Sequence, residues 1–126
     1  MARFKNLIVY QKSKDLVMQV YALLKQFPDE ERFALCGQIR RAAISIPSNI
    51  AEGMARMSNK DQSHFLNIAY GSLMELYAQI DIAHDLGYIN QNEYNKIEIC
   101  IDEIDKMIVS LSYIRKQNTV SNGNNK

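Results

Sequence analysis

The chain of 126 residues has no apolar run close to the ~20 residues that a membrane-spanning helix needs. Polar or charged residues also interrupt its N-terminal segment too often for the apolar core of a signal peptide. There are only two cysteines, Cys36 and Cys100, and each lies among apolar residues, as small buried side chains do in a reducing compartment. Hydrophobic residues make up 47% of the chain and charged residues 23%. These features predict a cytoplasmic protein with one ordinary core.

A strong excess of charge of either sign is also missing, since the formal net charge is +1. The charge is nevertheless uneven, because residues 1–74 hold ten lysines and arginines against six acids, whereas residues 75–126 hold five against eight. Two interpretations stay open at this point. The molecule presents a basic face to a partner, or its helices alternate in sign for solubility.

Motifs that carry catalysis are absent as well, since the sequence contains no glycine-rich phosphate loop, nucleophile elbow or Cys–His spacing. Two carboxylate–histidine pairs, Asp61 with His64 and Asp81 with His84, have the spacing seen in di-iron helix bundles. They fall in one predicted helix about 30 Å apart, so they cannot form a single site within a subunit. We therefore expect a non-enzymatic protein with no metal and no cofactor.

The apolar residues that are present recur at steps of three and four, the period of an amphipathic helix. They predict four helices over about residues 7–27, 30–56, 59–86 and 91–116, with Asn6 capping the first, Pro28 ending it and Gly87 ending the third. The fold prediction is all-α, an up-down-up-down four-helix bundle over residues 1–116. Residues 117–126 are polar and are predicted to form a disordered tail.

The most unusual stretch is residues 38–53, QIRRAAISIPSNIAEG, which has an apolar row beside a polar row. Pro47 stands in its middle and is expected to kink or loosen the helix. The side chains of Ser45, Ser48 and Asn49 flank the proline and are expected to bond the carbonyls that it frees.

Polar residues beside the predicted seams need partners. Glu75 lies next to the third helix's seam, and Arg40, Arg41 and Asn49 are its candidate donors. One interpretation is an internal network that sets the helix register. The other places Arg41, Asn49 and Glu52 at a subunit interface or in the lumen of an oligomer.

Tyr70, Met74 and Tyr77 recur on one side of the third helix, away from its seam. An exposed aromatic–methionine stripe of this kind indicates a contact surface. We expect an oligomer contact, with packing against the first helix or stacking of bases on the tyrosines as alternatives.

Four cations, Arg40, Arg41, Arg56 and Lys60, follow the second helix and its exit. Arginine suits bidentate contact with phosphate, so these residues are the candidate nucleic-acid-binding site. The alternative is that they are structural ion-pair partners. The sequence has no motif for reading bases in a sequence-specific way.

The stretch RRAAISIPSNIAEG, with SNKD at residues 58–61, FL at 65–66 and IAYGSLMEL at 68–76, resembles the 23S rRNA intervening-sequence family, also called S23 ribosomal protein. The resemblance covers residues 7–111 and implies a four-helix bundle that forms a homopentameric ring. It also implies electrostatic binding of structured RNA or another nucleic acid. The alternative that it suggests is a protein–protein scaffold docking a larger nucleic-acid enzyme, like the similar accessory protein of diversity-generating retroelements.

Overall fold

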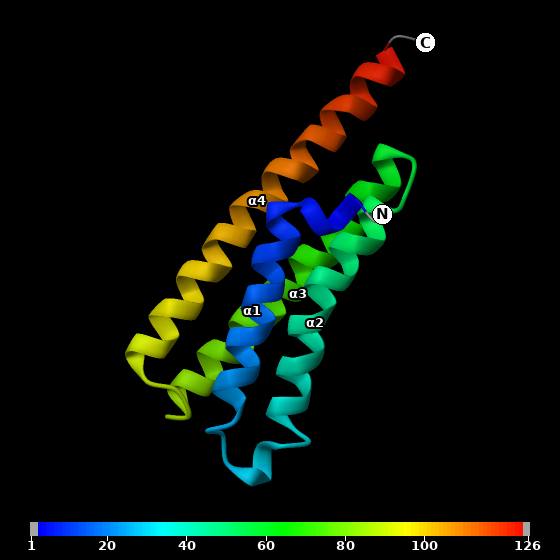
Figure 1. The fold of residues 1–126 in the computed structure, drawn as a ribbon. Helices are drawn as coiled ribbons and strands as arrows, with labels where there is room; N and C mark the ends of the chain where they lie inside the picture. The colour runs from blue at the N-terminus through cyan, green and yellow to red at the C-terminus, as the bar shows by residue number, and fades with distance from the viewer. Residues whose placement is uncertain (1–2, 125–126) are drawn as a thin grey trace.

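The computed structural model describes the backbone of residues 3–124 and the side chains of residues 4–117. It is built from helices, and no strand occurs within residues 3–124. The elements are η1 (Arg3–Asn6), α1 (Ile8–Leu24), η2 (Asp29–Glu31), α2 (Leu35–Met54), α3 (Asn59–Asp85) and α4 (Gln91–Asn124). The predicted all-α, four-helix fold is confirmed (Figure 1).

The four long helices pack side by side around one core (Figure 1). Each helix packs against the next in the chain, α4 also packs against α1, and η1 lies against α1 and α2. The core is made of the apolar stripes that the helical period predicted. Its largest fully buried side chains are Leu16, Ile39, Ile46, Ile50, Leu66, Leu73, Leu76, Ile80, Ile97, Ile101, Ile104 and Ile108.

Helices α3 and α4 are joined by a connection whose two ends are capped. Gly87 has a φ of 81°, and the N–H groups of Gly87 and Tyr88 donate to the carbonyls of His84 and Ala83, which is a Schellman motif. Asn90 and Glu93 then cap α4, because each side chain accepts a hydrogen bond from the other's backbone N–H. The role predicted for Gly87 is confirmed.

The start of the first helix differs from the prediction. Asn6 lies in η1, and the N-cap of α1 is Leu7, which makes no side-chain capping bond. The helix also ends at Leu24, three residues before the predicted end. The chain tightens there, since the N–H groups of Gln26 and Phe27 donate to carbonyls three residues back.

The second predicted helix is divided. Residues 29–31 form η2, and α2 begins only at Leu35. From there α2 runs as a continuous helix through the buried Pro47. Asn49 Nδ2 donates to the Ser45 carbonyl at 2.8 Å and to Ser45 Oγ at 2.9 Å. Asn49 thus bonds the carbonyl of Ser45, whereas the carbonyl that Pro47 leaves without its N–H donor is that of Ala43, so this bond is not the one that the sequence predicted.

Helix α4 continues to Asn124, whereas the sequence predicted its end at Lys116 and a disordered tail after it. A packed helix adds one hydrogen bond for each further residue, so it can extend over residues of modest propensity. The end of α4 extends past the other three helices (Figure 1). Residues 125–126 of the predicted tail lie outside the described residues. Within the part described, no helix has the length and apolar character needed to cross a membrane.

Candidate nucleic-acid interface

The four predicted nucleic-acid-binding cations do not form one cluster. Arg40 and Arg41 lie in the first half of α2, whereas Arg56 follows the end of α2 and Lys60 lies in the first turn of α3. Arg56 follows Arg40 by sixteen positions, most of them in α2, which corresponds to about 24 Å along the helix. The structure therefore divides the predicted site between the two ends of α2.

Arg56 already has partners within the subunit. Its Nη2 lies 2.9 Å from Glu52 Oε1, one turn earlier, and its guanidinium lies 4.7 Å from the centre of the Phe65 ring. Glu52 is thereby placed as the acid of a surface ion pair. At this end of α2, Arg56 therefore makes contacts within the subunit, as a structural ion-pair partner does, and Lys60 is exposed beside it.

The other end of α2 carries a groove. Arg40 Nη2 donates to the Arg32 carbonyl at 2.9 Å, which holds its side chain along the helix, and Arg41 is exposed. Both line a groove of about 630 Å³ between α1 and α2. The other lining residues are Tyr21, Phe33, Gly37, Ile44 and Ser45.

Two further grooves continue this one along the contact of α1 with α2. One, of about 360 Å³, is lined by Lys25, Arg32 and Arg40 among others, and the other, of about 310 Å³, by Lys14. Among the residues that line the three grooves, Asp29 is the single acid. We call this surface the α1–α2 face and define it by its cations Lys14, Lys25, Arg32, Arg40 and Arg41.

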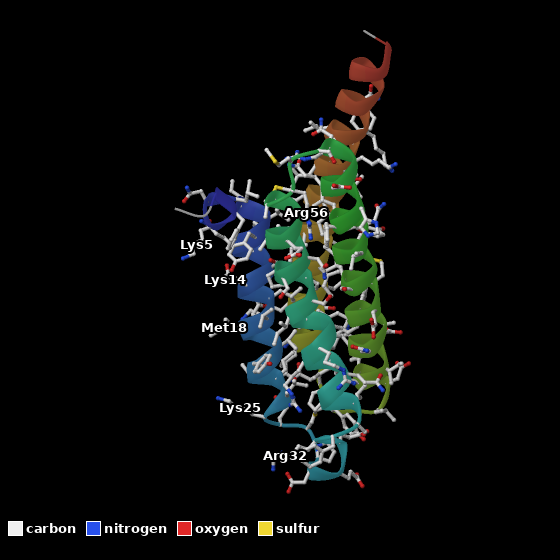
Figure 2. All side chains as sticks on the ribbon, turned by 90° about the vertical axis from the view of Figure 1, so that its right-hand side faces the viewer. Lys5, Lys14, Met18, Lys25, Arg32 and Arg56 are labelled. Atoms are coloured by element: carbon white, nitrogen blue, oxygen red, sulfur yellow. The ribbon has the colours of Figure 1, made fainter. Side chains whose placement is uncertain are left out.

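Lys14 and Lys25 were not predicted as site residues. Figure 2 shows Lys14, Met18 and Lys25 projecting from the same side of α1, with Lys5 nearby in η1 and Arg32 at the foot of α2. The steps from Lys14 to Met18 to Tyr21 to Lys25 are four, three and four, so the sequence does place them on one side of a helix. It does not show that this side borders α2.

The charge is segregated between the two halves of the bundle. Residues 3–56, which hold α1 and α2, carry nine lysines and arginines against five acids, a net charge of +4. Residues 59–110, which hold α3 and most of α4, carry three against nine, a net charge of −6. This separation agrees with the basic-face interpretation of the uneven charge.

The predicted internal network around Glu75 is wrong. Glu75 is exposed, and the hydrogen bond that it receives comes from Gln79 Nε2 at 3.2 Å. It is rotated about 100° from Leu76, which faces the core, so it lies beyond the edge of the buried stripe. The polar link between α2 and α3 is instead a hydrogen bond of 2.8 Å between Ser45 Oγ and Ser72 Oγ. A role for Arg41, Asn49 and Glu52 at a subunit interface or in the lumen of an oligomer stays a prediction.

This position of Glu75 has a measurable consequence. Glu75→Ala is expected to change the free energy of unfolding by less than about 0.5 kcal/mol, because a surface substitution removes no buried partner. Urea denaturation at fixed protein concentration measures it. A loss of about 3 kcal/mol would instead indicate a buried, paired carboxylate.

The stripe of Tyr70, Met74 and Tyr77 is not an open surface. All three side chains are half-buried and pack against the core. The Tyr77 hydroxyl donates to Glu98 of α4, and this bond raises the pKa of Tyr77. The exposure predicted for this stripe is therefore wrong, and Tyr77 contacts α4, whereas the alternative prediction named the first helix. A role of the three residues in an oligomer contact stays a prediction.

A second tyrosine joins the same two helices. The Tyr94 hydroxyl donates to Asp81 Oδ1 at 3.0 Å, and burial together with this bond raises the pKa of Tyr94. The ring of His84 stacks on Tyr94, with 4.6 Å between ring centres. Asp81 and His84, one of the two carboxylate–histidine pairs, thus contact a tyrosine. Among the described residues, no three His, Cys, Asp or Glu side chains are grouped closely enough to hold a metal ion.

The fold and this surface define a class, an all-α four-helix protein with a grooved basic face. Residues 5–110 match the family of 23S rRNA-intervening sequence proteins, and the chain belongs to that family. It is also similar to a crystal structure from Bacteroides thetaiotaomicron, described as a protein with unknown function from the S23 ribosomal protein family. That likeness has a TM-score of 0.77 and 28% sequence identity, and covers 83% of this chain and 98% of the other. No curated protein matches the chain.

Proposed function

We propose that this protein is a non-enzymatic, cytoplasmic helical bundle that binds structured RNA or another nucleic acid electrostatically through its α1–α2 face. The observation that carries the proposal is the row of grooves lined by Lys14, Lys25, Arg32, Arg40 and Arg41 with a single acid among them. Each cation that neutralises a phosphate releases a counterion from the nucleic acid, and this release supplies affinity for any base sequence.

We further propose that the bundle, in up-down-up-down order, assembles as a ring-shaped homo-oligomer, with five subunits as the family resemblance implies. The segregated charge supports assembly, because a basic half on one copy complements an acidic half on the next. A head-to-tail contact of this kind closes into a ring when its rotation allows. A ring would repeat the basic groups and so multiply the phosphate contacts.

Fluorescence anisotropy with a labelled RNA hairpin, between about 50 and 200 mM salt, tests the binding. The Arg40→Ala/Arg41→Ala variant is expected to lose about tenfold or more in affinity and to lower the salt slope by about 1–2, because the two groups contact phosphate. Arg41→Ala alone avoids disturbing the bond from Arg40 to the Arg32 carbonyl and is expected to act in the same direction.

A matched control removes the same number of charges elsewhere. Lys96 and Lys106 are exposed on α4, in the acidic half, and Lys96→Ala/Lys106→Ala is expected to leave the slope nearly unchanged. Equal effects of the two double variants would show that the protein responds to net charge alone. Absence of binding by the native protein at low salt would refute the proposal.

The exposed apolar side chains favour a second candidate, a scaffold that docks a larger nucleic-acid enzyme. Phe33, Ile44 and Met18 line the grooves of the α1–α2 face and are all exposed. Apolar contact with a protein partner is insensitive to salt, whereas phosphate contact weakens steeply as salt rises. The same salt series therefore separates the two candidates.

A further inference from the structure

Phe33 is the most exposed aromatic residue in the described part of the chain, with 89% of its surface accessible to solvent. It lies on the turn between η2 and α2, at the edge of the groove of about 630 Å³ that Arg40 and Arg41 line. Phenylalanine side chains are generally among the most buried. A solvent-exposed aromatic ring beside a basic groove is suited to bind a ligand that has a flat apolar face.

The groups around Phe33 are mostly cationic, so they complement a ligand that also carries negative charge. The Arg32 guanidinium lies 5.3 Å from the centre of the Phe33 ring. Arg40 and Arg41 line the same groove, and Tyr21 lines it from α1. Aromatic rings that stack bases, next to cations that hold the backbone, are the combination by which proteins bind single-stranded nucleic acid.

A nucleic-acid duplex cannot use both the exposed ring and the cations of this groove. The faces of its bases are stacked on one another and are unavailable to a protein ring, whereas loops, bulges and single strands expose them. A volume of about 630 Å³ lies in the range of pockets that hold a small ligand, so the groove has room for an unpaired base with its sugar and phosphate.

We infer that the groove between α1 and α2 binds unpaired nucleotides, with a base stacked on Phe33 and its phosphates held by Arg40 and Arg41. This inference rests on the proposed nucleic-acid binding and specifies its ligand. The protein would bind single strands, or the unpaired loops of a structured RNA, in preference to helical segments.

The first test compares an oligouridylate with a blunt-ended RNA duplex that has the same number of phosphates. Charge density alone favours the duplex, since its phosphates lie closer together. We expect the native protein to bind the oligouridylate more tightly. Phe33→Leu keeps an apolar side chain but removes the ring, so it is expected to weaken oligouridylate binding by about fivefold or more without changing the salt slope or the duplex affinity.

A spectroscopic test observes the stacking itself. The chain has no tryptophan, so Phe33→Trp provides a single reporter at the groove. Its fluorescence is expected to be quenched by the oligouridylate and to change little with the duplex or with heparin, a polyanion without bases. Tyr113 is 62% exposed on α4, away from the groove, and Tyr113→Trp and Tyr113→Leu are the matched controls, with no quenching and no loss of affinity expected.

The outcomes separate this inference from the proposed function. If the duplex binds as well as the oligouridylate and Phe33→Leu changes neither, the inference is overturned while electrostatic binding stands. If neither RNA binds at low salt, both are overturned. If Phe33→Leu lowers the molecular mass of the assembly, Phe33 belongs to an interface between copies and the inference is likewise overturned.

Discussion

Ile46→Ala is expected to lower the free energy of unfolding by about 2–5 kcal/mol, among the largest effects of any single truncation in this chain. Ile46 lies close to the midpoint of α2, and its side chain is fully buried in the common core. Truncation removes the transfer free energy of its buried carbons. It also leaves a cavity that the tightly packed neighbours fill only in part.

Ile44 provides the matched control because it is the same residue type in the same helix, two positions earlier. Its side chain is 45% exposed and lines the α1–α2 groove. Ile44→Ala is expected to cost less than about 1 kcal/mol, since little buried surface is lost. Both variants are measured by urea denaturation at one protein concentration, because any assembly makes stability depend on concentration. Similar losses for the two would contradict the burial pattern of α2.

Gly53→Val is expected to lower the free energy of unfolding by about 2–3 kcal/mol through overpacking. Gly53 is buried near the end of α2, where α2 and α3 approach closely. A Cβ added at Gly53 would lie 2.9 Å from Phe65 Cβ and 3.4 Å from the Gln62 carbonyl oxygen. Both of these atoms belong to, or are held directly by, the α3 backbone, so they cannot move aside without shifting the helix.

Gly71 is the control for this substitution. It lies within α3 and is exposed, and a Cβ there would meet no atom within 4 Å. Gly71→Val is expected to leave stability unchanged or to raise it by up to about 0.5 kcal/mol, since valine has the better helix propensity. Thermal unfolding of the two variants beside the native protein measures both effects. If Gly53→Val were as stable as Gly71→Val, the close approach of α2 to α3 would be disproved.

The sequence predicted well those parts of the fold in which a residue or a stripe is compatible with few conformations or packing arrangements. Gly87 has a positive φ that side chains rarely adopt, so glycine after a helical stretch indicated the end of α3. In α4, a stripe of isoleucines recurs at steps of four, three and four, and all of its members are buried: Ile97, Ile101, Ile104 and Ile108. A stripe this regular can be buried by a helix in only one way.

Two of the predictions that were wrong concern residues at the edges of such stripes. Glu75 and Tyr77 both lie beside the α3 seam, and the helical period alone does not tell which edge is covered. The structure covers the edge that carries Tyr77, where Glu98 of α4 meets the hydroxyl, and leaves Glu75 in solvent. Which flank of a helix is buried depends on where its two neighbours lie, and no local pattern contains that information.

By itself the sequence determined the all-α class, the four helices and the residues at the centre of the core, because helical periodicity and helix-ending residues act over a few positions. Only the tertiary structure decided the candidate site. It separated Arg56 and Lys60 from Arg40 and Arg41, and it brought Lys14 and Lys25 of α1 to the side of α2 on which Phe33 is exposed. Such a surface is made by two helices in contact, so its composition depends on how they are rotated about their axes, which is set by the packing of the whole core.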